Sequence, residues 1–477
     1  MFAAKVRRFS ILSREGIFFD DRYIVMYITI PFIGIESGIL GIRSVHAPGK
    51  TGRGETMKRL AFAAGVLAFL LMGQAGFAKT LEEVLKEKGV ITEADFKEVT
   101  AARPVAYQIG KGFTFTSPDA RFQLSLGGRG QFQYQYLDRD DVNGPAQNSG
   151  LWRIRRFKVY MGGHAFTRNL TYRVQADLAK SGTAQMLDDA WINYRFIDEV
   201  QLQAGQFKIP FSRGELTSDG MLQFVDRANA VDAFKPSYDI GAMVAGKTAG
   251  GMIAYNAGIF NGTGQSGTHT TNSGAWAARI VFNPFGEIRY SEADLQNTPS
   301  PLLSLGACYF ANTLKRNGNA TFLDTTTSTP PYAGTAGWLG KAAANTAIFD
   351  NTERVDVGTY GLDAAFKWRG LSAQGEYFGG NAEGRNLGRT VHSRGYYGQA
   401  GYFLLPKKLE VAARYSSVDP NRDRTRDLQL EVTGAVSYYF EGHLLKIQGD
   451  CTNIHKQVVG KPATDDRQVR VQAQVAF

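Results

Sequence analysis

Apolar and polar side chains alternate in the last ten residues of the chain. The apolar positions are Val469, Val471, Ala473, Val475 and Phe477, and the polar ones between them are Gln468, Arg470, Gln472 and Gln474. Successive side chains of a strand point to opposite faces, so this segment has one apolar and one hydrophilic face. A final strand of this kind, ending on an aromatic residue, is typical of a transmembrane β-barrel, which meets lipid outside and water inside.

The same two-residue period recurs from Arg121 onward, and no apolar run in that part is long enough for a membrane helix. Counting the alternating segments predicts sixteen strands, which begin near residues 122, 153, 170, 187, 200, 238, 251, 274, 302, 355, 371, 394, 408, 427, 443 and 466. We therefore predict an all-β fold, a 16-stranded antiparallel transmembrane β-barrel with a short N-terminal amphipathic helix. A soluble β-sandwich also alternates, but aromatic strand ends and the terminal Phe477 favour the barrel.

Connections between the predicted strands alternate between short and long. Short turns face the periplasm and long loops face outside in barrels of the bacterial outer membrane. An even number of strands then places both ends of the barrel in the periplasm. One link departs from the rule, because residues 284–301 are long for a periplasmic turn.

A complete secretory signal peptide lies inside the chain. Residues 57–78 combine a basic start, an apolar core and a small-residue cleavage site. Since a signal peptide normally begins a chain, we expect residues 1–56 to be upstream sequence that is translated by mistake. The alternative is a membrane anchor at residues 24–42, but Pro31, Glu36 and several glycines interrupt that run.

The segment that follows the signal peptide, residues 79–110, begins with a helical pattern. Thr80 and Glu83 form a capping box, and the apolar residues Leu81 and Val84 share one helical face. We expect a periplasmic helical segment that acts as a plug, a tether, an oligomer-forming coil or a helix packed on the barrel mouth. The barrel domain then occupies residues 111–477.

Charge and cysteine usage exclude several classes of function. Half of the formal net charge of +10 lies in residues 1–78, which hold ten Lys and Arg against five Asp and Glu. The rest of the chain is only mildly basic, which argues against nucleic-acid binding. Cys308 and Cys451 fall in separate predicted strands and no CxxC motif is present, so we expect no disulfide framework, no metal site and no cofactor.

A barrel of sixteen strands encloses an aqueous channel rather than a packed core. Extending the alternation places nine cations on its hydrophilic face: Arg129, Arg156, Lys158, Arg173, Arg279, Lys367, Arg414, Lys446 and Arg470. The acids on the same face are Asp177, Asp363, Glu376, Glu410 and Asp450. Charged rings in a pore favour counter-ions, so this excess of cations predicts a moderate preference for anions. For each residue alone, the alternative is a pair with a neighbouring strand that only stabilises the wall.

The third long link follows the fifth predicted strand, where trimeric porins commonly fold a loop inward to narrow the pore. Its charged residues are Arg213, Glu215, Asp219, Asp226, Arg227, Asp232 and Lys235. We expect a constriction of mixed charge. The alternative is an exposed, solvated loop.

Several motifs resemble the phosphate-selective porin O and P family. They are Gly205 to Phe211 (GQFKIPF), Phe224 to Arg227, Ala233 to Pro236, Arg155 to Val159, Phe282 to Phe285 with Tyr290 to Glu292, and Tyr438 to Leu445. The resemblance covers residues 80–477 and also accounts for the long turn at residues 284–301. It implies a homotrimeric porin of the bacterial outer membrane whose arginine-lined lumen passes phosphate or polyphosphate.

We therefore expect a water-filled channel for passive diffusion of small anions, in contact with outer-membrane lipid. We also expect Phe477 to be recognised by the barrel-assembly machinery. The closest competitor is a general diffusion porin with weak selectivity, followed by a barrel that sheathes an electron-transfer partner. An outer-membrane barrel enzyme is disfavoured because the histidines after residue 78 lie in no recognisable catalytic motif.

Overall fold

The computed structural model describes residues 17–20, 23–26, 85–90, 92, 105–108, 110, 112–145, 148–180, 183–267, 274–315, 349, 354–386 and 388–477. The chain divides into two compact units, Met1–Ile91 and Thr92–Phe477. In the first unit, β1 (Ile17–Asp20) pairs antiparallel with β2 (Tyr23–Met26). The predicted upstream extension, signal peptide and N-terminal helix lie almost entirely outside the described residues, so these assignments stay predictions.

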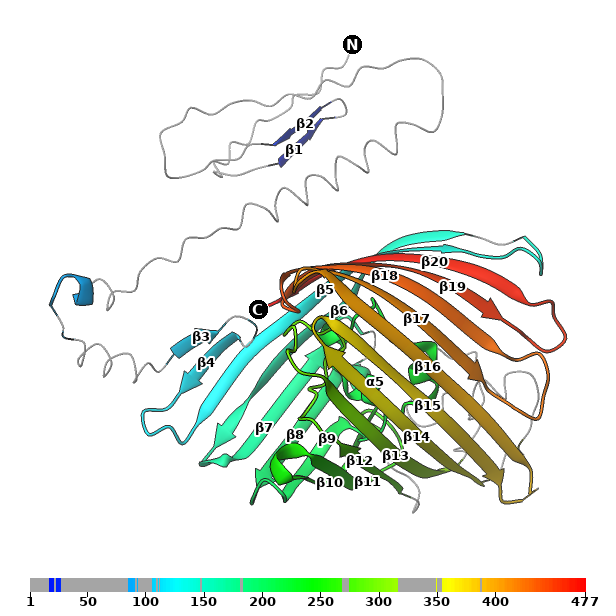
Figure 1. Cartoon of the computed structure of the whole chain (residues 1–477), viewed down its shortest axis with the longest axis horizontal. Helices are drawn as coiled ribbons and strands as arrows, with labels where there is room; N and C mark the ends of the chain where they lie inside the picture. Colours follow the sequence, from blue (N-terminus) through cyan, green and yellow to red (C-terminus); the bar gives the residue numbers. More distant parts are fainter. Residues whose placement is uncertain are drawn as a thin grey trace, which may run out of the picture. The chain divides into compact units, whose positions relative to one another are not determined.

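The second unit is a closed antiparallel barrel in which each strand pairs with the next along the chain (Figure 1). Its strands are β5 (Gln123–Asp138), β6 (Ser149–Ala165), β7 (Thr167–Asp177), β8 (Leu187–Arg195), β9 (Gln201–Lys208), β10 (Tyr238–Thr248), β11 (Ile253–Phe260), β12 (Ala275–Phe282), β13 (Leu302–Lys315), β14 (Arg354–Trp368), β15 (Leu371–Gly384), β16 (Thr390–Leu405), β17 (Leu409–Asp419), β18 (Gln429–Glu441), β19 (Leu445–Lys456) and β20 (Thr464–Ala476). Pairing of β20 with β5, from Arg467 with Asp138 to Ala476 with Arg129, closes the barrel. The predicted sixteen-stranded fold is confirmed, and each strand begins within four residues of its predicted start.

A short hairpin continues the barrel seam beyond the end of β20. Its strands are β3 (Val105–Gln108) and β4 (Gly112–Thr116), and β4 pairs with the first residues of β5, from Gln123 to Leu126. Just past the end of β20, the N–H of Phe477 donates to the carbonyl of Gly128 of β5 at 3.0 Å, and the N–H of Gly128 donates to the carbonyl of Phe477 at 2.8 Å. Strand β3 falls in the last part of the predicted N-terminal segment, residues 79–110, and extends the sheet there.

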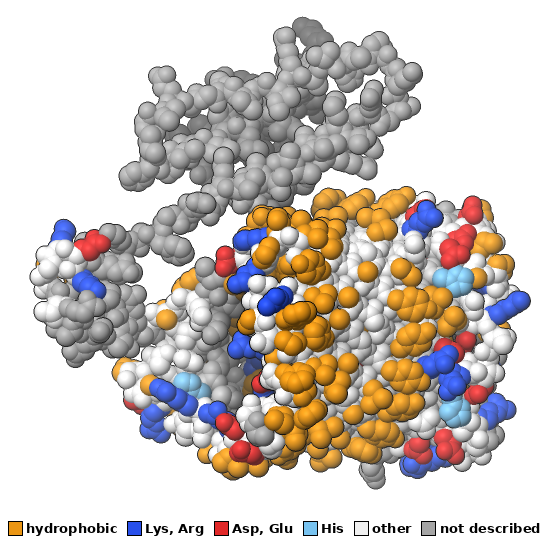
Figure 2. Space-filling view, in the orientation of Figure 1, with side chains coloured by type: hydrophobic (Ala, Val, Ile, Leu, Met, Phe, Trp, Pro, Cys, Tyr) orange, Lys and Arg blue, Asp and Glu red, His pale blue; other side chains and the backbone are white. Residues whose placement is uncertain are grey.

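The outer face of the barrel wall is apolar. On β20, Val469, Val471 and Val475 remain 40–48% exposed, as the alternating pattern predicts for side chains that meet lipid. Figure 2 shows hydrophobic side chains gathered over the barrel wall and charged side chains gathered toward its ends. Among the described residues, no helix is long and apolar enough to cross a membrane.

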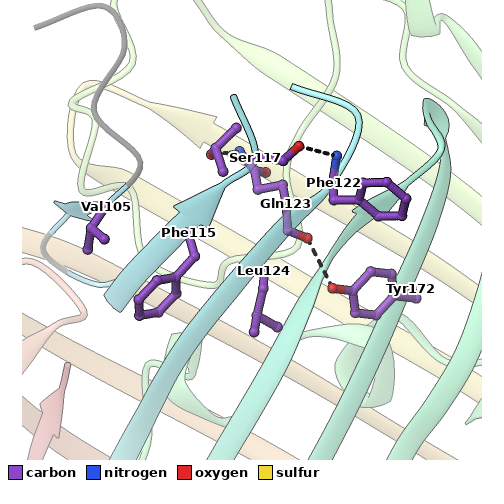
Figure 3. A pocket seen from close by; sticks show the side chains of 8 residues that line it. Val105, Phe115, Ser117, Phe122, Gln123, Leu124 and Tyr172 are labelled. Atoms are coloured by element: carbon purple, nitrogen blue, oxygen red, sulfur yellow. Dashed lines mark hydrogen bonds between the residues drawn. The ribbon is translucent and has the colours of Figure 1, made fainter. Parts of the chain in front are cut away.

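A groove on this outer face lies beside the β3–β4 hairpin, and Val105, Phe115, Leu124 and Tyr172 line it (Figure 3). Leu124 of β5 and Tyr172 of β7 both pair with Gly163 of β6, which lies between them. A Cβ at Gly163 would meet the carbonyl oxygen of Gln123, so the close approach of the two strands requires glycine there. The Tyr172 hydroxyl donates to that same carbonyl at 3.0 Å.

The link between β9 and β10, residues 209–237, folds into the barrel; we call it the inward loop. It contains α5 (Arg213–Leu216), η1 (Asp219–Met221) and α6 (Asn229–Phe234), and α5 lies inside the ring of strands in Figure 1. Phe211 and Phe234 of the loop stack on Phe378 of β15 at 6.0 and 5.4 Å between ring centres. The inward-folded alternative is thus the one observed. The other short helices are α4 (Thr183–Met186) and η2 (Ala249–Gly251).

Candidate functional site

The nine cations predicted on the hydrophilic face lie on the inner side of the wall. Seven of them contact the inward loop: Arg129, Arg156, Lys158, Arg279, Arg414, Lys446 and Arg470. Lys367 donates to the carbonyl of Ala293 at 2.8 Å, and Arg173 lies 3.4 Å from Asp189 of β8. The charge that reaches the pore is therefore set jointly by the wall and by the segments that fold against it.

Asp219 of the inward loop lies among three cations of β5 and β6. Its carboxylate contacts Arg129, the Nε of Arg156 at 3.0 Å and the Nζ of Lys158 at 2.8 Å. Burial alone would raise the pKa of Asp219, but these three charges outweigh burial and hold it well below its ordinary value. Asp219 is consequently an anion fixed between three basic side chains.

Asp226, seven residues further along the loop, lies among three arginines. Arg155 and Arg156 contact its Oδ1 at 3.1 and 2.9 Å, and Arg470 contacts its Oδ2 at 3.3 Å. Here too burial raises the pKa and the arginines, led by Arg156, lower it further than burial raises it. Arg156 joins both carboxylates, through Nε to Asp219 and through Nη2 to Asp226.

Sequence reasoning missed Arg155 as a contact of the loop, because it assumed an unbroken alternation along β6. The register of β5 with β6 shifts between Gln131 and Phe132, so Arg155 is the extra residue of a β-bulge. A bulge changes the side-chain phase, and consecutive residues Arg155 and Arg156 therefore both reach Asp226. No local signal in this strand identifies the bulge.

Glu215 of α5 forms a third charge cluster, which holds the two ends of the inward loop together. Its partners are Lys208, Arg227 and Lys235, at 3.8, 3.4 and 3.3 Å. Burial would raise the pKa of Glu215, but these cations lower it to about 2. Arg227 also donates to the carbonyls of Gly214 and Thr217 at 2.8 and 2.6 Å, so this predicted constriction residue ties the loop to itself.

Glu376 of β15 anchors the start of α5 to the wall. It accepts hydrogen bonds from the Ser212 hydroxyl at 3.0 Å and from the backbone N–H groups of Arg213 and Gly214 at 2.8 and 2.6 Å. These N–H groups begin a helix and have no partners within it. Glu376, predicted as an acid of the pore lining, thus serves as an acceptor for the loop.

The remaining wall cations bind an acid or a backbone carbonyl. Arg279 pairs with Asp363 at 2.7 Å, and both side chains are at most 1% exposed. Arg414 donates to the carbonyl of Asp226 at 2.9 Å, and Lys446 donates to that of Leu222 at 2.8 Å. A carbonyl oxygen accepts each of these hydrogen bonds and does not neutralise the positive charge of Arg414 or Lys446.

The long turn between β12 and β13, residues 283–301, also folds toward the inward loop. Glu292 accepts from the N–H of Gln223 at 2.7 Å, and the Glu292 N–H donates to the carbonyl of Met221 at 3.1 Å. Arg213 stacks on the Tyr290 ring at 5.1 Å. The unusual length of this turn, evident in the sequence, therefore provides contacts that brace the inward loop.

Two cavities adjoin the inward loop. One, of about 240 Å³, is lined by Arg155, Asp226, Arg227, Arg414 and Arg470, with five other residues. The other, of about 300 Å³, includes Arg213 and Tyr290 at the long turn. In the described part of the chain, no group of three or more His, Cys, Asp or Glu side chains is arranged to hold a metal ion.

The chain is similar to several known proteins. Residues 124–477 match the phosphate-selective porin O and P family, which confirms the resemblance found in the sequence motifs. An uncharacterized protein of Aquifex aeolicus is 25% identical over 427 residues, covering 82% of this chain and 93% of that protein. Among solved structures, the anion-selective porin from Comamonas acidovorans has a TM-score of 0.49 at 11% identity, covering 74% of this chain and 99% of its own. The outer membrane channel DcaP of Acinetobacter baumannii has a TM-score of 0.48 at 13% identity, covering 76% and 99%.

Proposed function

Because the chain belongs to the phosphate-selective porin O and P family and forms a channel of the bacterial outer membrane, we propose that it passes small anions by passive diffusion. The observation that carries this proposal is the set of nine cations on the inner wall, seven of which contact the inward loop. Fixed positive charge at a constriction lowers the energy of anions there and raises that of cations.

Phosphate and polyphosphate are the specific solutes that we propose within this class. The family description supports this choice, and so does the prevalence of arginine, whose planar fork donates two parallel hydrogen bonds to an oxyanion. The competing function is a general porin with weak selectivity. Its support is that Asp219 and Asp226 of the inward loop already form ion pairs with several of the wall cations.

We propose that the barrel is not an enzyme. In the part of the chain that the structure describes, the contact most like a catalytic pair is that of Ser291 with His443, whose Nε2 lies 3.1 Å from the serine oxygen. A serine nucleophile needs a histidine that is oriented by an acid. The other ring nitrogen of His443 instead faces Lys446 at 3.3 Å, and burial together with that lysine lowers the pKa of His443 well below its ordinary value.

A homotrimer is the assembly that we propose. The shortest strands lie on one side of the barrel. They are β8, β9, β11 and β12, with 8 or 9 residues each, whereas β13 to β16 have 14 to 16. If other copies of the chain packed against the side with the short strands, that side would be shielded from lipid. Recognition of Phe477 by the barrel-assembly machinery also remains a proposal.

The test is the zero-current potential of the purified channel in a planar bilayer under a KCl gradient, followed by titration with inorganic phosphate. An anion-selective potential, with current blocked by low phosphate concentrations, would support an oxyanion channel. A potential near zero without phosphate block would identify a general diffusion porin, and a cation-selective potential would contradict the proposal.

A further inference from the structure

The inward loop places two carboxylates where permeating anions would bind the wall. Asp219 is held by Arg129, Arg156 and Lys158, and Asp226 is held by Arg155, Arg156 and Arg470. The donors come from three strands that meet at the barrel seam, β5, β6 and β20, whereas both acceptors come from one loop. Each carboxylate thus occupies a site whose three basic side chains suit an oxyanion.

We propose that Asp219 and Asp226 are selectivity-determining residues that act as built-in counter-anions, lowering the anion preference that the bare wall would have. This inference rests on the proposed anion channel and names the residues that limit its selectivity. It concerns how strongly the pore discriminates, and it applies to chloride as well as to phosphate.

The local balance of charge supports this role. The wall contributes five cations to the cluster, Arg129, Arg155, Arg156, Lys158 and Arg470, and two acids, Asp188 and Asp450, which pair with Lys158 and Arg470 at 2.7 Å. The loop contributes two more acids, Asp219 and Asp226. Replacing both would raise the net charge of this cluster by two, while the cations and acids of the wall stay in place.

Burial strengthens the electrostatic effect of these charges. Asp219 and Asp226 are at most 9% exposed, and Arg156 and Lys158 are each 7% exposed. Charges at such positions are screened by salt much less than surface charges are. A change in two of them should therefore alter ion selectivity under ordinary experimental salt concentrations.

The geometry also shows why the two acids differ from the other acids of the loop. Glu215 binds Lys208, Arg227 and Lys235, of which the last two belong to the loop itself. Asp232 pairs with Lys235 at 2.8 Å and its side chain is 52% exposed. Asp219 and Asp226 alone among these four make ion pairs with cations of β5, β6 and β20, so their removal changes the charge of the wall.

The test compares the wild-type channel with the double variant Asp219→Asn/Asp226→Asn in planar bilayers under a KCl gradient. Asparagine keeps nearly the same shape and a hydrogen-bond acceptor but removes the charge. We expect the chloride-to-potassium permeability ratio to rise by about threefold or more, because two fixed negative charges leave the constriction. The matched control is Asp356→Asn. Asp356 lies on β14 and forms an exposed ion pair with Arg385 at 2.7 Å, so its replacement should leave the permeability ratio unchanged.

Single-channel conductance separates this role from a purely mechanical one. If the aspartates mainly hold the loop against the wall, their loss would release the loop and raise the conductance. The chloride-to-potassium permeability ratio would then stay unchanged or fall. That outcome would overturn the inference, as would an unchanged ratio at unchanged conductance. A wild-type channel without anion preference would contradict the proposed function, whereas a rise in the variant's ratio would still support the inference.

Folding is checked by the heat-dependent mobility of the purified barrel on gels. If the double variant does not fold, Arg156→Gln supplies the complementary test, because Arg156 joins both carboxylates. Its loss leaves the acids in place with one cation fewer, so the chloride-to-potassium ratio should fall about twofold or more. A ratio that rises or stays unchanged in this variant would contradict the inference.

Discussion

Along β20 the two faces of the barrel wall differ in what surrounds each side chain. The outward Val469, Val471 and Val475 are 40–48% exposed, whereas the inward Arg470, Gln472 and Gln474 are at most 8% exposed. A water-soluble protein has the reverse arrangement, with apolar side chains inside and charged ones outside. The outer face needs only apolar character to meet lipid, but every buried polar group on the inner face needs a specific partner.

The inward loop supplies many of these partners. The side chain of Gln474 donates to the carbonyl of Gly220 at 3.0 Å, and Arg470 reaches both Asp226 and Asp450. The inner face is therefore specified by pairwise contacts and the outer face by hydropathy alone. Substitutions should accordingly have different consequences on the two faces, and the following predictions test that difference in order of decreasing effect.

The largest effect is expected where a buried ion pair on the inner face loses one partner. The Arg279→Met variant leaves Asp363 without its cation, and both side chains of this pair are at most 1% exposed. Because a buried charge without a partner is costly, the variant should destabilise the barrel by about 3–5 kcal/mol. The double variant Arg279→Met/Asp363→Leu should recover most of this loss, because no isolated charge remains. Urea unfolding in lipid vesicles measures both values. A double variant as unstable as the single one would show that the pair itself, rather than the isolated charge, matters.

The next effect concerns a charge placed on the outer face. Val471 lies near the middle of β20 and is 48% exposed, so Val471→Lys would place an ammonium group in the hydrocarbon region. We expect a loss of about 2–4 kcal/mol, as for lysine near the bilayer midplane on other barrels. Val471→Ala is the control that shortens the side chain without adding charge. Equal stability of the two variants would place Val471 outside the hydrocarbon region.

Acid should weaken the inward loop through Glu215. The pKa of its carboxyl is lowered from 4.5 to about 2, so its stabilisation is complete well above pH 4.5 and is lost as the pH falls toward 2. Between neutral pH and pH 3 this loss amounts to about 2 kcal/mol. Unfolding free energies measured at both pH values should fall more steeply in the wild type than in Glu215→Gln. Parallel curves would exclude Glu215 as the titrating group.

The two faces also differ in how far the sequence predicts them. The period of two identified the outer face and the strand starts, because lipid imposes the same requirement on every outward residue. It also placed Arg129, Arg156 and the other wall cations on the inner face. The prediction from alternation missed the inward contact of Arg155. A β-bulge changes which side chains point inward, and nothing in the composition of the strand indicates it.

Partners on the inner face depended on contacts between residues distant in the sequence. Glu376 was predicted as a lining acid, but it binds the start of α5, more than 160 positions earlier in the chain. Likewise, Asp219 and Asp226 were predicted as constriction charges, without their partners on β5, β6 and β20. Local patterns specify which way a side chain points, whereas the fold of the inward loop decides what that side chain meets.

The smallest predicted effect tests whether polar atoms on the outer face also need partners. The Tyr172 hydroxyl donates to the carbonyl of Gln123 across Gly163, as the dashed line in Figure 3 shows. Since little water is available beside lipid to replace this bond, Tyr172→Phe should cost about 1 kcal/mol in the same unfolding assay. Tyr402→Phe is the matched control, because Tyr402 is 50% exposed on β16 and no hydrogen bond links its hydroxyl to another described residue. Equal losses in the two variants would mean that the cost comes from the hydroxyl's contact with the membrane interface, and that hydropathy alone does govern the outer face.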